Sequence, residues 1–213
     1  MMERGNHLIL MADIIKSRKA DQRKLMNSFK EIVQYINGRE KKNFLSPMTI
    51  TLGDEFQSVV KNLPAALKII FAIEEKIIAL KSEFKLRYVL VEGKIETPLN
   101  TEIAYGMLGS GLTFAREQLV SLKNGKNRFN FKLKDLKKGG ALNSAFFSLQ
   151  HLIDDWRIEK DYYIVSEFLQ HKDYKQVAAD LDKERSLMWK REKSLKVEEY
   201  FALKEVVKYI GGN

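Results

Sequence analysis

Cysteine is absent from this sequence, and proline occurs at only three positions. The absence of cysteine excludes disulfide bridges, thiolate-bound metal ions and any thiol nucleophile. The sequence also lacks a run of about 18 uninterrupted apolar residues, so no transmembrane helix is expected. The apolar segment 8–15 is interrupted by Asp13, and no small-residue cleavage site follows it, so we interpret it as a strand rather than a signal peptide. We therefore expect a soluble, cytoplasmic protein without a membrane partner.

Hydrophobic residues make up 45% of the 213 residues and charged residues 31%, a composition typical of a globular protein. The net charge of +9 is unevenly distributed. Segment 121–140 contains a single acid, Asp135, and seven basic residues, namely Lys123, Lys126, Arg128, Lys132, Lys134, Lys137 and Lys138. Such a window favours a polyanionic partner such as nucleic acid or a nucleotide phosphate, although lysines also keep solvated loops and edge strands soluble.

The pattern of apolar residues predicts two parts with a boundary near Gly139. In residues 1–139 the expected strands are 7–15, 44–52, 55–60, 86–95 and 128–133, and the expected helices are 22–37, 64–82 and 112–122. In residues 140–213 only helices are expected, at 141–156, 162–170, 174–181, 184–195 and 198–210. The first part fits an α+β, ferredoxin-like palm domain in which helices cover one face of an antiparallel sheet. The second part is predicted to be an all-α domain.

Two acids occur where such a palm brings strand ends together. Asp13 lies near the end of the first expected strand, and Asp54 lies at the tip of the Gly53-Asp54 hairpin. Paired carboxylates suit Mg²⁺ or Mn²⁺, because hard cations take oxygen ligands and bridge to phosphates. Glu55 is expected to point to the opposite face of its strand. Either aspartate taken alone is more typical of ordinary turn or capping chemistry than of a metal site.

The N-terminal part carries four characteristic segments: Ala12–Ser17 (ADIIKS), Thr51–Gln57 (TLGDEFQ), Leu86–Val89 with Gly93, and Gly106–Glu117 ending in ARE. Together they resemble the SatD family, which is similar to class III nucleotidyl cyclases and, more distantly, to diguanylate cyclases. The resemblance covers about residues 7–120, and its most specific part is the Gly-Asp-Glu-Phe hairpin one helix after the Asp-Ile-Ile strand.

This resemblance implies a nucleotidyl-cyclase-like palm in which Asp13 and Asp54 hold Mg²⁺ or Mn²⁺ with a nucleoside triphosphate. The cationic residues that we expect near the nucleotide are Lys16, Arg18, Arg87 and Arg116. Arg116 is also the candidate catalytic residue. The cyclases place an asparagine four residues before this arginine, whereas here the residue is Leu112, which argues against cyclisation.

Residues 174–191 have the spacing of a helix-turn-helix of the sigma-factor type, which this segment resembles. Asp182 stands at the turn position where glycine is usual. The second helix offers basic residues to double-stranded DNA, namely Lys183, Arg185, Lys190, Arg191 and Lys193. A helical hairpin that packs on the palm or forms a homodimer remains the alternative. No ligand spacing is assigned to the three histidines His7, His151 and His171.

Three functional hypotheses follow. The first is a bacterial-type DNA-binding regulator whose cyclase-like domain binds nucleotide, divalent metal or both. The second is an active two-metal nucleotidyl-transfer enzyme that uses Arg116 and the basic window 123–138. The third is a non-catalytic oligomerisation or interaction module.

Overall fold

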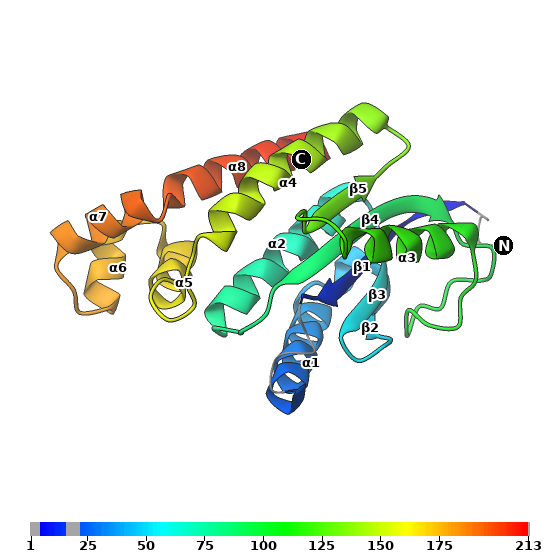
Figure 1. The fold of residues 1–213 in the computed structure, drawn as a ribbon, viewed down its shortest axis with the longest axis horizontal. Helices are drawn as coiled ribbons and strands as arrows, with labels where there is room; N and C mark the ends of the chain where they lie inside the picture. Colours follow the sequence, from blue (N-terminus) through cyan, green and yellow to red (C-terminus); the bar gives the residue numbers. More distant parts are fainter. Residues whose placement is uncertain (1–4, 16–21, 213) are drawn as a thin grey trace.

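A five-stranded sheet forms one half of this computed structural model, which describes residues 5–15 and 22–212 (Figure 1). The strands follow the order β2-β3-β1-β4-β5 across the sheet. Their bounds are β1 Asn6–Ile14, β2 Phe44–Ile50, β3 Glu55–Val60, β4 Leu86–Lys94 and β5 Phe129–Lys132. The order of strands and helices predicted for the palm is confirmed.

The sheet is mixed rather than antiparallel. Strand β1 pairs antiparallel with both β3 and β4, and β2 pairs antiparallel with β3. Strand β5 pairs parallel with β4, so the expectation of an antiparallel sheet is wrong at this edge. The reason is the connection: helix α3 (Ser110–Leu122) lies between β4 and β5, and such a crossover returns the chain to the same end of the sheet.

Helices cover both faces of the sheet, whereas one covered face was expected. Helices α1 (Gln22–Arg39) and α2 (Leu63–Ala79) pack on the face that includes Leu10 and Ala12. Helix α3 packs on the face that includes Ile9 and Met11. Because successive side chains of a strand point to opposite faces, β1 is buried on both sides and reads as a continuous apolar run.

The C-terminal part is entirely helical in the described residues, and it packs closely on the palm. Its helices are α4 Leu136–Asp154, α5 Tyr162–His171, α6 Tyr174–Asp180, α7 Arg185–Ser194 and α8 Val197–Gly211. Helix α8 returns along α4 and α2, while α6 and α7 lie at the end of the molecule away from the sheet (Figure 1). The Tyr200 hydroxyl donates to Glu75 on α2 (2.9 Å), and the Trp156 indole donates to the carbonyl of Leu195 (2.9 Å).

The boundary expected near Gly139 falls inside α4. This helix begins early because the Asp135 side chain accepts a hydrogen bond from the amide of Lys138 (2.9 Å) and so caps the first turn. The main hydrophobic core then runs without interruption from Leu10 in β1 to Val207 in α8. A short 3-10 turn, η2 (Lys41–Asn43), precedes β2. Within residues 5–15 and 22–212, no helix is both long and apolar enough to cross a membrane.

Candidate functional site

Three charged residues form a row across the sheet at the end of β1. Asp13 pairs directly with Glu55 of β3 on one side and with Arg87 of β4 on the other. Side chains of directly opposed residues lie on the same face of an antiparallel pair. The row therefore continues the face of Ile9 and Met11, which α3 covers. The expectation that Glu55 points away from Asp13 is wrong, because the register places the two acids side by side.

Helix α3 completes this cluster with two further cations. Arg116 donates from Nη2 to Glu55 Oε1 at 2.5 Å, and Lys123, just after the helix, places Nζ 3.1 Å from Asp13 Oδ2. Arg87 Nη1 lies 3.3 Å from both carboxylate oxygens of Asp13. We call these five residues, Asp13, Glu55, Arg87, Arg116 and Lys123, the charged cluster.

The two carboxylates of the charged cluster are buried, whereas Lys123 and Arg116 remain almost half exposed. The side chains of Asp13 and Glu55 are 4% and 8% exposed, against 47% for Lys123 and 43% for Arg116. Burial raises the pKa of Glu55 above its ordinary value; Arg116 and Lys123 oppose this shift, and the charge of Asp13 adds to it. The cluster is thus a pair of desolvated acids beneath two cations, Arg116 and Lys123, that solvent and ligands can reach.

Glycines hold α3 close enough to the sheet for this geometry. A Cβ atom built on Gly111 would lie 2.6 Å from the carbonyl carbon of Gly93 in β4. The start of α3 is further fixed by Glu96, whose carboxylate accepts from the amide (2.8 Å) and the hydroxyl (2.9 Å) of Ser110. The glycine-bearing stretch seen in the sequence is therefore a close contact between backbones.

The remaining palm residues of the expected site have different outcomes. Asp54 lies half-buried just before β3, and its carbonyl accepts from the amide of Ile14 (2.9 Å). Asp54 precedes β3, and the strand register that places Glu55 opposite Asp13 does not include it, so Asp54 as a metal ligand stays a prediction. Lys16 and Arg18, expected near the phosphates, lie outside the described residues.

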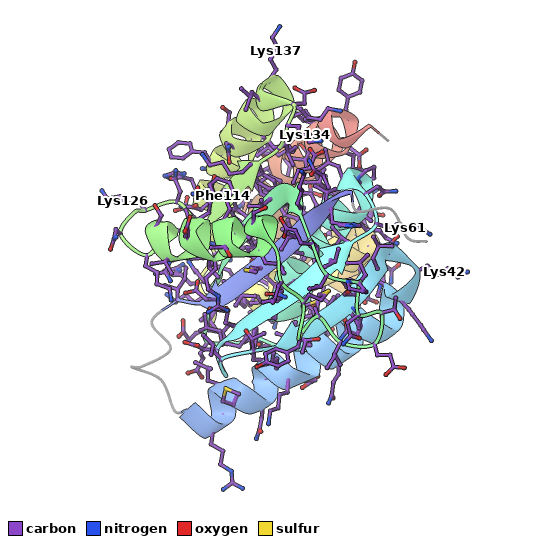
Figure 2. The ribbon with its side chains drawn as sticks, turned by 90° about the vertical axis from the view of Figure 1, so that its right-hand side faces the viewer. Lys42, Lys61, Phe114, Lys126, Lys134 and Lys137 are labelled. Carbon is purple, nitrogen blue, oxygen red and sulfur yellow. The ribbon has the colours of Figure 1, made fainter. Side chains whose placement is uncertain are left out.

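The basic window 121–140 is not a single surface. Lys123 joins the charged cluster, but Arg128 is 3% exposed and pairs with Glu74 at 2.9 Å. Figure 2 shows Lys126, Lys134 and Lys137 projecting from separate places. The hypothesis that the whole window holds a triphosphate is therefore wrong for Arg128, because burial and a carboxylate partner already satisfy its guanidinium.

Helices α6 and α7 are joined by a turn in which Asp182 has a φ of 51°. Asp182 thus takes the left-handed conformation at the position where the sequence comparison expected glycine. Lys183, Arg185 and Lys190 are exposed.

Two of the basic residues expected at DNA are instead paired with acids of the protein, Arg191 with a buried one and Lys193 with one at the surface. Arg191 is paired with buried Asp161, and Lys193 lies 2.8 Å from Glu198. Arg191 was expected to be exposed, which is wrong, since only 26% of its side chain is accessible.

Sequence reasoning missed Glu55 and Lys123 as members of the charged cluster. The register between the first strand and the hairpin would have identified Glu55, because that register sets Glu55 directly opposite Asp13. Lys123 was expected only as part of the basic window 123–138, since its place beside Asp13 depends on where α3 ends.

The comparisons with known proteins give a family and a set of distant structural similarities. The family model described as "SatD family" matches residues 7–210. The chain is similar to a bacterial light-regulated adenylyl cyclase (13% identity, TM-score 0.44, covering 60% of this chain and 75% of that chain). It is also similar to a dimeric guanylyl cyclase domain from the aquatic fungus Blastocladiella emersonii (17% identity, TM-score 0.42, 55% and 74%). A third is the guanylate cyclase domain from Catenaria anguillulae in complex with GTP (17%, 0.40, 57% and 75%). No curated protein matches the sequence.

Proposed function

This chain belongs to the SatD family, and we propose that its charged cluster binds a nucleoside triphosphate together with Mg²⁺ or Mn²⁺. The observation that carries the proposal is the burial of two directly opposed carboxylates, Asp13 and Glu55, beneath three cations from β4 and α3. Like charges that directly oppose each other destabilise a sheet, so the two carboxylates depend on the three cations or on a bound metal ion.

The charges of the cluster suit a metal–phosphate ligand. Without a ligand, Arg87 and Lys123 pair with Asp13, and Arg116 pairs with Glu55. When a divalent cation takes the carboxylate oxygens, Arg87, Arg116 and Lys123 are released toward phosphate oxygens, which are their natural partners. Asp13 and Glu55 supply hard oxygen donors, and Asp54 at the adjacent hairpin is the further carboxylate that we propose as a ligand. The donor set therefore fits Mg²⁺ or Mn²⁺ and lacks the sulfur and imidazole groups that softer metals prefer.

We propose binding rather than turnover. Leu112, one turn before Arg116 on α3, is 8% exposed and packs in the small core beneath that helix. No polar group is thus present at the position where a cyclase would stabilise the transferring phosphate. Release of pyrophosphate or formation of a cyclic nucleotide would instead support the enzymatic alternative.

Addition of Mn²⁺ and a nucleoside triphosphate should raise the melting temperature. A ligand present at 100 times its Kd stabilises the native state by about 2.7 kcal/mol. For a chain of this size that corresponds to about 5–10 °C. Asp13→Asn should abolish the shift, and Glu55→Gln and Asp54→Asn should each reduce it. Differential scanning fluorimetry with all four common triphosphates measures these shifts.

The matched control is Asp155→Asn, which makes the same chemical change at an exposed residue just after α4. It should keep the full shift. A wild-type protein that shows no shift with any triphosphate, or an Asp13→Asn variant that keeps it, would contradict the nucleotide proposal.

A second candidate function, binding of double-stranded DNA, is favoured by the α6–α7 pair. The two helices contact each other across the tight turn at Asp182, and α7 presents Arg185 and Lys190 to solvent at the end of the molecule away from the sheet. Trp189 is 48% exposed on the same helix, so it is not buried against the palm as the interaction-module alternative requires within one chain.

A continuous set of contacts supports coupling between the two sites. Arg128 donates to the carbonyl of Leu86 (2.8 Å), next to Arg87, and pairs with Asp154 of α4 (3.2 Å). Two residues further along the chain, Trp156 holds the end of α7 through the carbonyl of Leu195. We propose that nucleotide binding shifts this network and thereby the presentation of α7.

Arg185→Ala with Lys190→Ala should weaken binding to duplex DNA and flatten its salt dependence. Each lost phosphate contact reduces the slope of log K against log salt by about 0.9, so the double variant should lose about two units of slope. Fluorescence anisotropy with a mixed-sequence duplex at several salt concentrations measures both quantities. Arg191 is left unchanged in this test because its removal would take a cationic partner from the buried carboxylate of Asp161 and destabilise the protein.

Lys42→Ala with Lys61→Ala is the control for charge alone, since both lysines are exposed and lie on the other end of the molecule (Figure 2). This variant should retain the wild-type slope. Equal weakening by the two double variants would mean that DNA responds to overall positive charge and does not contact α7 in particular. Absence of any complex at low salt would exclude DNA as a partner.

A further inference from the structure

The geometry points to a separate metal site in the helical part, built from Glu167, His171 and Asp180 and suited to Zn²⁺ or a similar borderline divalent ion. Among the residues that the structure describes, this is the one group of three metal-ligating side chains whose ligand atoms all lie within 4.8 Å of one another. It lies on α5 and α6 and is independent of the charged cluster on the sheet.

The three side chains come together through simple helix geometry. Glu167 and His171 are four residues apart on α5, which places them on the same face of the helix. Lys172 then takes the left-handed conformation (φ 55°), and Asp173 caps α6 two residues after α5 ends. This tight turn folds α6 back so that Asp180, at its last turn, faces His171.

The distances match the ligand spacing of a small ion. His171 Nε2 lies 3.2 Å from Asp180 Oδ2 and 3.8 Å from Glu167 Oε2. Zn²⁺ binds imidazole nitrogen and carboxylate oxygen at about 2.0–2.2 Å, which places tetrahedral ligands roughly 3–4 Å apart. One imidazole and two carboxylates also leave a fourth position open for water. The imidazole favours Zn²⁺, Co²⁺ or Ni²⁺ over Mg²⁺ and Ca²⁺.

A neighbouring amide orients one of the ligands. Gln176, one turn earlier on α6, donates from Nε2 to Asp180 Oδ1 at 2.8 Å. That hydrogen bond leaves the other oxygen, Oδ2, directed at His171. Removing a hydrogen-bond partner of this kind from a metal-binding carboxylate typically lowers metal affinity by about 10–100-fold.

Metal binding here would fix α6 against α5. Helix α6 has only seven residues, too few to be stable by itself, so its position depends on its contacts with neighbouring helices. A metal ion held by Glu167 and His171 on α5 and by Asp180 on α6 would link the two helices across their tight turn.

Calorimetric titration of the tag-free 213-residue chain with Zn²⁺ in excess Mg²⁺ tests the site. We expect one equivalent of Zn²⁺ that His171→Ala and Asp180→Asn remove and that Gln176→Ala weakens at least about tenfold. Glu167→Gln should also weaken binding. Circular dichroism checks that each variant is folded, which is expected because all of these side chains are at least partly exposed.

Two control variants test whether the Zn²⁺ equivalent binds at this site and not elsewhere. His151→Ala removes an exposed histidine from α4, outside the group, and should keep the Zn²⁺ equivalent. Asp13→Asn should keep it as well, which separates this site from the charged cluster, so failure of either proposal can be recognised independently. The inference is overturned if the wild type binds no such equivalent, if His171→Ala retains it, or if His151→Ala or Asp13→Asn loses it.

Discussion

Replacing Arg128 with methionine is expected to lower the free energy of unfolding by about 3–5 kcal/mol. Arg128 and Glu74 are almost completely buried, and two hydrogen bonds of 3.2 and 2.9 Å join them. Without the guanidinium, Glu74 would keep a buried charge with only the Tyr88 hydroxyl (2.8 Å) as a partner. Chemical denaturation monitored by circular dichroism measures the change.

Lys126→Met is the matched control. Lys126 lies two positions before Arg128 in the sequence and carries the same charge, but its side chain is exposed (Figure 2). Its effect should stay within about 0.5 kcal/mol. The double variant Arg128→Met with Glu74→Gln should recover much of the loss, since the remaining amide is neutral and still accepts from Tyr88. An Arg128→Met protein as stable as wild type would show that Arg128 and Glu74 do not form this buried ion pair in solution.

Gly111→Ala is expected to destabilise the protein by about 1–3 kcal/mol and to weaken the charged cluster. The added methyl group would lie 2.6–2.8 Å from backbone atoms of Gly93 and Lys94, which cannot rotate away as a side chain could. Helix α3 must therefore move from the sheet, and Arg116 and Lys123 move with it. Denaturation measures the stability, and the Mn²⁺–triphosphate melting shift measures the site.

Gly140→Ala makes the same substitution in another helix, α4, where nothing lies within 4 Å of the added atom. It should stabilise the protein by about 0.4–1 kcal/mol, because alanine loses less backbone freedom on folding. The two substitutions should thus have opposite signs. A Gly111→Ala variant that gains stability would mean that α3 does not approach β4 as closely as the structure shows.

Most elements of the fold could be predicted from the sequence because their signals are local. The period of the apolar residues in α1 and α2, the Gly53-Asp54 hairpin and the alternation of the strands require no knowledge of distant residues. The expected helix 112–122 between the last two strands already implied a crossover and hence the parallel pairing of β5, which the expectation of an antiparallel palm overlooked. The place of α3 on the second face could not be predicted in this way, since it depends on which face the crossover takes. The merging of the two parts into one core likewise depends on α8 packing against α2.

The candidate site was predictable in outline and incorrect in detail. Asp13 was identified from its position at a strand end, and Arg87 and Arg116 from their charge and the resemblance. Glu55 was placed on the wrong face because a strand-end residue changes face with a shift of one position in register. Arg191 looked available for DNA because its partner, Asp161, is 30 residues away in the sequence.

The return of α8 to the palm has a consequence for synthesis of the chain. Glu75 on α2 and Tyr200 on α8 are separated by 125 residues, and Phe71 on α2 packs edge-on against the Tyr200 ring. The ribosome releases the chain from its N-terminus, at about 5–20 residues per second. The nascent palm therefore leaves this face of α2 uncovered during the many seconds before residues 197–211 emerge, and the native core closes only after them.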